Sequence, residues 1–359
     1  MHFELCASVM ILSIDFGGAV AKVLIVQDDK FDVVEVPLGF RTRPRLTISE
    51  ALRYIIKTAV GEAAAESAKA IYVSGEIASM ELKEIVTAAA LDPVEVLKKL
   101  ELPLVVVGAG ITYFGGQAHR GENLALKAEE IARFLPFKLP LSEVQNFFAN
   151  KEIYPQIVPT TERAHKLEQA AARIRIQSAV GRLGGWAVSD YIIASGGVLS
   201  KAPHPSEVVL MLLDSLQPRG LLRIYLDTKQ LLPALGTLAI YQEEKAQKIL
   251  DQKPVDFLGT AFSVAEDVSL WLDLGLSEPQ ELEVDAGELV TFPLDEGQTA
   301  KVKFETQSQK GEFEAQGGPC GLVIDARGRP LELPPTEGER IKCLRKWEED
   351  ICRYPLFKK

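Results

Sequence analysis

The chain has 359 residues, of which 47% are apolar and 25% charged, a composition typical of a folded protein with room for two domains. Its formal net charge of −10 repels phosphate backbones and anionic lipid, which argues against a nucleic-acid or membrane-surface partner. No apolar stretch is long enough to span a bilayer, and the four cysteines lack metal or dithiol spacing. We therefore expect a cytoplasmic protein with reduced thiols.

The chain opens with a β-meander. Residues 1–9 lack a basic signal-peptide region and are expected to be a leader, because Met10 directly precedes the first strong strand pattern. Apolar runs separated by Asp- and Gly-containing turn signals predict three consecutive strands, at residues 10–14, 20–26 and 31–36.

Helices and short buried strands alternate over the next part of the chain. Apolar residues at helical spacing predict helices at 47–59, 80–100 with a break near 92–93, 124–135, 160–183 and 204–217. Short buried runs predict strands at 70–73, 104–107 and 191–194. From about residue 278, short strands divided by Gly, Asp and Pro predict a small β domain, closed by a polar helix over 337–354.

The first turn carries residue types suited to phosphate. Asp15 precedes Gly17 and Gly18, and glycine lets backbone N–H groups approach a phosphate without a Cβ clash. Asp15 is placed to hold Mg²⁺ directly or through water, and Lys22 on the next strand to reach a phosphate. An ordinary hairpin turn and a solvated lysine remain the alternative interpretation of these residues.

Two further strands run into glycines. The strand at 104–107 leads into Gly108, Gly110 and Thr112, and the strand at 191–194 leads into Ser195-Gly196-Gly197. Glycines after a buried strand let the flat surface of a nucleotide lie against backbone. One strand-to-glycine turn is common in α/β proteins, but three in one chain favour a shared nucleotide cleft.

The order of these turns resembles the phosphate-1, phosphate-2 and adenosine motifs of the actin-like (ASKHA) ATPases. The later two-thirds of the chain, about residues 120–350, resembles the MutL/GlmL family of accessory proteins associated with glutamate mutase. The stretches that carry this second resemblance are residues 150–161, 167–173, 195–205, 231–236 and 321–330.

The resemblance implies an α/β fold of two actin-like (ribonuclease H-like) lobes around a nucleotide cleft. On that basis we expect a reduced first lobe over residues 10–103 and a second lobe over 104–277. Residues 278–359 would form the small β domain with its C-terminal helix. The cofactors implied are ATP or ADP with Mg²⁺, bound by Asp15 and the three glycine turns.

Departures from the family pattern weaken the predicted catalysis. Ala19 replaces a hydroxyl residue of the first motif, and Gly108 stands where the second motif has Asp. Without that carboxylate, we expect at most a weak ATPase. Glu76 is a candidate replacement, with a turn or helix cap as the alternative, and the turn at 325–330 is either structural or a partner contact.

Three functions are compatible with the sequence. The leading hypothesis is a nucleotide-binding, chaperone-like accessory protein for a cobalamin-dependent mutase or related enzyme, with a protein partner and with homo-oligomers permitted. The second is a pseudo-ATPase scaffold that binds proteins without nucleotide. The third is a small-molecule kinase, although no base for a substrate hydroxyl stands out. The four histidines show no metal spacing.

Overall fold

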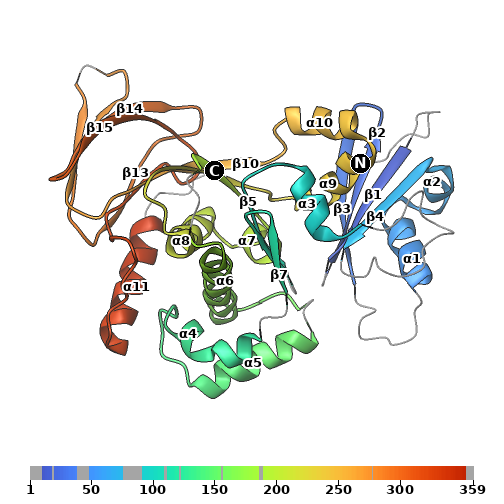
Figure 1. Cartoon of the computed structure of the whole chain (residues 1–359), viewed down its shortest axis with the longest axis horizontal. Coiled ribbons are helices and arrows are strands. Elements are labelled where there is room, and N and C mark those ends of the chain that lie inside the picture. Colours follow the sequence, from blue (N-terminus) through green and yellow to red (C-terminus); the bar gives the residue numbers. More distant parts are fainter. Residues whose placement is uncertain are drawn as a thin grey trace.

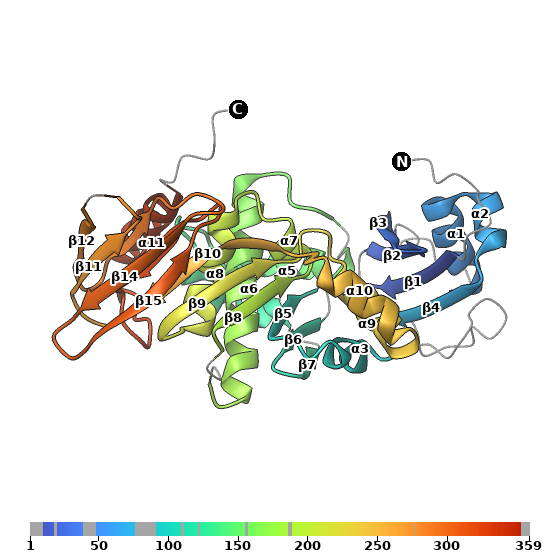
Figure 2. The same cartoon turned by 90° about the horizontal axis from the view of Figure 1, so that it is seen from above.

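We describe the protein from a computed structural model of the chain (Figure 1). The structure describes residues 10–17, 20–38, 48–75, 91–108, 111–120, 123–154, 157–185, 189–276 and 278–352. Three β-sheets follow one another along the long axis of the molecule, with the N-terminal sheet at one end and the C-terminal sheet at the other (Figure 2). No helix within these ranges is long and apolar enough to cross a membrane.

The first sheet has the strand order β3-β2-β1-β4. Its strands are β1 (Met10–Phe16), β2 (Val20–Gln27), β3 (Lys30–Pro37) and β4 (Ala70–Gly75). β2 pairs antiparallel with both β1 and β3, whereas β4 runs parallel to β1. β1 is buried along its whole length, which explains why its sequence is a near-continuous apolar run. The predicted meander is confirmed.

Helices cover both faces of the first sheet. On one face lie α1 (Ile48–Val60) and α2 (Glu62–Ser67). On the other face lie α3 (Pro93–Lys99), α9 (Leu232–Tyr241) and α10 (Glu243–Asp251). α9 and α10 therefore belong spatially to the first sheet, although they follow the strands of the second sheet in the chain (Figure 1).

The second sheet repeats the topology of the first. Its order is β13-β16-β10-β9-β8-β5-β6-β7, in which β5, β6 and β7 form an antiparallel meander and β8 runs parallel to β5. The bounds are β5 (Leu104–Val107), β6 (Ile111–Phe114), β7 (Gln117–Arg120), β8 (Tyr191–Ser195), β9 (Gly220–Leu226), β10 (Asp256–Ser263), β13 (Leu289–Phe292) and β16 (Leu322–Asp325). A meander followed by a parallel strand in both sheets is the duplicated two-lobe arrangement predicted above, so the fold class is confirmed.

A helical layer packs on the second sheet. Its helices are α4 (Ala128–Ala132), α5 (Leu141–Ile153), α6 (Glu162–Arg182), α7 (Gly197–Ser200) and α8 (Pro205–Leu216). α6 is buried on several sides, because it contacts the sheet and α8 and also carries a separate apolar cluster shared with α4 and α5. The helix predicted over 124–135 is shorter than expected: a 3-10 turn, η2 (Leu124–Lys127), leads into α4.

The third sheet has the order β12-β11-β14-β15. It contains β11 (Val268–Asp273), β12 (Gln280–Val284), β14 (Thr299–Glu305) and β15 (Lys310–Gln316), and α11 (Glu337–Cys352) packs nearby against α8 and β13. Because β11 joins this sheet whereas β13 and β16 join the second, the chain passes between the two sheets more than once. The domain boundaries at 103 and 277 stay a proposal.

A buried charge network ties the second sheet to its helices. Asp214 on α8 accepts from Arg173 Nε at 2.7 Å and from Arg327 Nη1 at 2.9 Å. The Asp325 carboxylate at the end of β16 accepts from Arg327 and Arg329, and the Arg327 guanidinium lies 4.6 Å from the centre of the Trp347 ring on α11. Every charge in this network has an opposite partner, as buried ions require.

Candidate functional site

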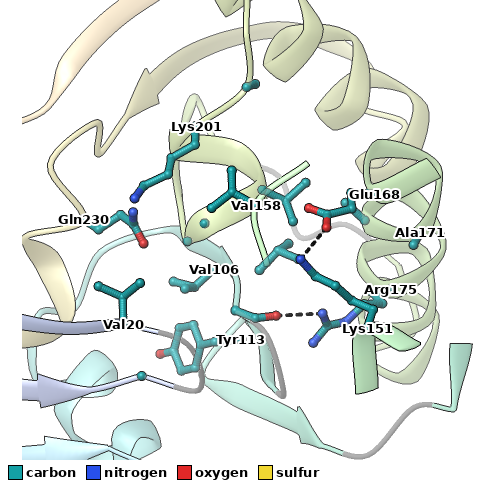
Figure 3. A pocket seen from close by; sticks show the side chains of 18 of the residues that line it. Val20, Val106, Tyr113, Lys151, Val158, Glu168, Ala171, Arg175, Lys201 and Gln230 are labelled. Atoms are coloured by element: carbon teal, nitrogen blue, oxygen red, sulfur yellow. Dashed lines mark hydrogen bonds and ion pairs between the residues drawn. The ribbon is translucent and has the colours of Figure 1, made fainter. Parts of the chain in front are cut away.

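A cavity of about 220 Å³ lies where the first and second lobes face each other (Figure 3). We call it the interlobe cavity. Three predicted turns reach it from three different strands, since Asp15, Gly17, Gly108, Gly196 and Gly197 all line its wall. The predicted positions therefore converge, although they are up to 182 residues apart, from Asp15 to Gly197.

The first hairpin places an ion pair at the cavity. Asp15 lies opposite Lys22 in the β1–β2 register, with Oδ2 and Nζ 3.8 Å apart, and both side chains are largely buried. The Gly17 N–H donates to Val20 O at 3.2 Å, and a Cβ at Gly17 would lie 2.7 Å from that oxygen, so this turn requires glycine. Gly18 and Ala19 lie outside the described residues.

The second hairpin presents a carbonyl that is already bonded. Gly108 O accepts from Arg175 Nη1 on α6 at 2.7 Å, and Figure 3 shows this bond. Gly110 lies outside the described residues. Thr112 is not part of the cavity wall: it is 2% exposed on β6, and its Oγ1 has no hydrogen-bond partner among the residues that the structure describes.

The third turn is held tightly against β5. Gly196 has φ +94°, and a Cβ there would lie 2.4 Å from Val107 O, so both the dihedral and the close approach require glycine. Ser195 points away from the cavity. Its hydroxyl donates to Asp227 Oδ2 at 2.8 Å, which makes Ser195 a support for the turn rather than a part of its lining.

Asp227 joins this turn to the first lobe. Its carboxylate also accepts from the backbone N–H groups of Leu231 at 2.8 Å and Leu232 at 3.0 Å, where α9 begins. Burial raises the pKa of Asp227. The rise is opposed by these two backbone hydrogen bonds, by the hydrogen bond from Ser195 and by the nearby Lys22 ammonium. Because α9 packs on β1 and β4, Asp227 connects the glycine turn to the sheet that carries Asp15.

Helix α6 supplies a wall of the cavity that the sequence pattern did not predict. Side chains at helical spacing face the cavity from it, namely His165, Glu168, Gln169, Ala172 and Arg175. Glu168 Oε1 lies 2.6 Å from Lys151 Nζ, which reaches over from the end of α5 (Figure 3). A second stripe of polar residues along the predicted helix was the available signal for this wall.

The cavity wall carries more positive than negative charge. Its cations are Lys22, Lys151, Arg175 and Lys201, and its carboxylates are Asp15 and Glu168, which gives +2 with His165 neutral. This local charge opposes the net charge of −10 of the whole chain. The cavity is therefore suited to an anion, whereas the rest of the surface repels one.

The donor set fits Mg²⁺ only together with a ligand. Within the described ranges, no three His, Cys, Asp or Glu side chains converge as a metal site. Mg²⁺ commonly keeps several waters and binds through one or two carboxylates plus substrate phosphates. Asp15 supplies one such carboxylate, and its pairing with Lys22 has to be exchanged for the ion.

Comparison with protein families finds one relevant match. Residues 122–253 match the family model described as "MutL protein", which confirms the predicted resemblance over that part of the chain, less than half of its length. The further stretch at 321–330 lies outside the match. No curated protein sequence matches the chain.

Solved structures give weak similarities. A ROK family protein from Streptococcus pneumoniae in complex with sucrose is 12% identical, with a TM-score of 0.33, and covers 66% of this chain and 100% of its own. ROK hexokinase from Thermus thermophilus is 16% identical, with a TM-score of 0.32, and covers 64% of this chain and 98% of its own.

Proposed function

Because residues 122–253 match the MutL family, we propose that this chain is a nucleotide-binding accessory protein of the glutamate mutase type, which assists a cobalamin-dependent mutase or a related enzyme. The observation that carries the nucleotide part is the convergence of three glycine turns on one cationic cavity in an otherwise acidic protein. ATP or ADP supplies the negative charge that such a wall attracts.

Each group at the cavity has a place in this proposal. Asp15 would hold Mg²⁺ through water beside the phosphates, and Lys22 would contact a phosphate oxygen once released from Asp15. Arg175 lies beside the second hairpin and would contact the phosphates next to Gly108. Gly196 and Gly197 would lie under the nucleoside, because they bring backbone to the cavity wall without side chains.

Hydrolysis is proposed to be slow. The second hairpin has Gly108 where a carboxylate would orient Mg²⁺ or the attacking water. Both carboxylates of the cavity wall are ion-paired, Asp15 with Lys22 and Glu168 with Lys151. Glu76, the candidate replacement, lies outside the described residues.

The deciding experiment is calorimetric titration of ATP and ADP, with and without Mg²⁺. In wild type, Mg²⁺ is expected to raise the affinity for ATP about tenfold, which corresponds to about 1.4 kcal/mol. We expect Asp15→Ala to abolish this gain in affinity. The matched control is Asp32→Ala, which removes a carboxylate from β3 outside the cavity wall. No binding to wild type under any condition would contradict the nucleotide proposal.

The partner is tested separately, by affinity capture from the source cell with tagged protein. Co-purification of a cobalamin-dependent mutase subunit is expected, and capture of an unrelated complex without one contradicts this assignment. A pseudo-ATPase scaffold is the second candidate, favoured by the ion pairs that already occupy the three lysines of the cavity wall. Micromolar, Mg²⁺-dependent nucleotide binding would count against the scaffold.

A further inference from the structure

Glu35 on β3 joins the two lobes at the edge of the interlobe cavity. Its carboxylate forms an ion pair with Lys201, which directly follows α7, and accepts from Gln230 Nε2 at 2.9 Å. Lys201 and Gln230 both line the cavity and belong to the part of the chain that follows β8, whereas Glu35 belongs to the first sheet. Figure 3 shows the Lys201 ammonium and the Gln230 amide close together at one side of the cavity.

Glu35 also belongs to a row of alternating charges. The strand registers place Asp15 opposite Lys22 and Lys22 opposite Glu35, and residues directly opposite one another share a face of the sheet. The row then continues to Lys201 through its ion pair with Glu35. Glu35 is therefore positioned as an internal counter-ion between two cations that line the cavity.

The interlobe cavity is small for a nucleotide. Its volume of about 220 Å³ is below the range of roughly 300–1,000 Å³ found for pockets that bury drug-sized ligands, so we expect the lobes to move apart when a nucleotide binds. Behind the cavity, buried hydrogen bonds keep α9 on the first sheet, from Ser13 Oγ to Ala234 O at 2.7 Å and from Thr237 Oγ1 to Ser74 Oγ at 2.6 Å. The Glu35 contacts are more exposed, so they are the ones that we expect to open.

We propose that Glu35 is an interlobe latch, which occupies Lys201 and Gln230 until a polyanionic ligand takes its place. The identity of that ligand rests on the proposed function. A triphosphate carries more negative charge than one carboxylate, so it competes for Lys22 and Lys201 and releases the first lobe from Glu35. Glu35 thus affects ligand binding through Lys201 and Gln230, by competing with the ligand for them.

The test is calorimetry of MgATP and MgADP with Glu35→Gln, which keeps the shape and an acceptor for Gln230 but removes the charge. Affinity for MgATP is expected to rise about three- to tenfold, with a smaller gain for MgADP and smaller gains at high salt. The gain should disappear in a Lys201→Met background. Asp32→Asn is the matched control, because it makes the same charge change on β3 outside the cavity wall.

A Glu35→Gln affinity no higher than that of Asp32→Asn, or a gain that persists without Lys201, overturns the latch. If no variant binds nucleotide, the proposed function fails and hydrogen exchange decides on the latch alone. Amides at 227–231 and 30–36 should then exchange faster in Glu35→Gln and in Lys201→Met, with no further increase in the double variant. Unchanged exchange in both single variants overturns the latch as well.

Discussion

Gly196 offers the sharpest test of how the third glycine turn is built. Gly196→Ala introduces a Cβ 2.4 Å from Val107 O, closer than the 3.0 Å below which real Cβ contacts hardly occur. Turn and strand must therefore move apart by at least 0.6 Å, from 2.4 to 3.0 Å. β5 cannot yield easily, because it is paired with β6 on one side and β8 on the other.

Two effects add in this variant. A non-glycine residue at φ +94° costs about 1–3 kcal/mol in backbone strain, and overpacking against a fixed neighbour costs about 1–3 kcal/mol more. Gly287→Ala separates them, since Gly287 has φ +91° but nothing within 4 Å of the added Cβ. The control carries the dihedral strain alone.

The assay is differential scanning calorimetry of wild type and both variants at one protein concentration. A difference of about 1–3 kcal/mol corresponds to a transition lower in Gly196→Ala than in Gly287→Ala by roughly 1–4 °C, because unfolding of all 359 residues carries an entropy of about 0.75 kcal/mol/K. Equal losses in the two variants would refute the close approach of Gly196 to β5. A loss in Gly287→Ala alone would refute it as well.

Three further predictions concern buried charges. Arg327→Met leaves Asp214 and Asp325 with one fewer buried partner each and is expected to destabilise the fold by about 3–5 kcal/mol in thermal unfolding, whereas exposed Lys310→Met should stay near wild type. Burial opposes ionisation of Asp325, but Arg327 and Arg329 outweigh burial and lower the pKa of Asp325 to about 2. The ionised Asp325 therefore stabilises the fold above its ordinary pKa of 3.8, and this contribution is lost as the pH falls through about 2. Arg329→Met should consequently unfold at a higher pH than wild type in an acid titration. Asp227→Ala removes the acceptor for two N–H groups at the start of α9 and should cost about 1–2 kcal/mol, with Asp227→Asn closer to wild type.

The elements that could be predicted were those with local signals. The meander of the first sheet follows from apolar runs interrupted by Asp- and Gly-containing turns, and all three of its strands lie where expected. The glycine turns after β5 and β8 were found in the same way. Their convergence on one cavity follows because the meander of the first lobe recurs in the second.

Helix α6 shows why the burial of some charged residues behind the site could not be predicted. Its apolar residues, including Leu167, Ala170 and Ile174, indicate one buried face, and its charged residues read as solvent-facing. In the structure Lys166 and Arg173 are buried as well, because Glu207 and Asp214 on α8 pair with them at 2.9 and 2.7 Å. Partners 41 residues away decide the burial of these cations, and no local pattern contains that information.

Helix α9 shows the same limit at the level of the lobes. Its sequence follows the strands of the second sheet, and proximity along the chain places it in the second lobe. It packs instead on β1 and β4, where Thr237 donates to Ser74, 163 residues away. The chain therefore crosses between the lobes a second time, and hydropathy alone cannot distinguish this from an ordinary continuation of the second lobe.

The pairing of the cavity charges bears on which ligand the site accepts. Lys22, Lys151 and Lys201 are each paired with a carboxylate, and Arg175 donates to Gly108 O, so a ligand gains contacts there only by displacing existing ones. A polyphosphate can do so, because it brings several negative charges to cations that now share three carboxylates. A neutral ligand brings no charge and leaves each pair intact. Affinity should therefore rise from AMP to ADP to ATP, since each added phosphate competes for one more cation.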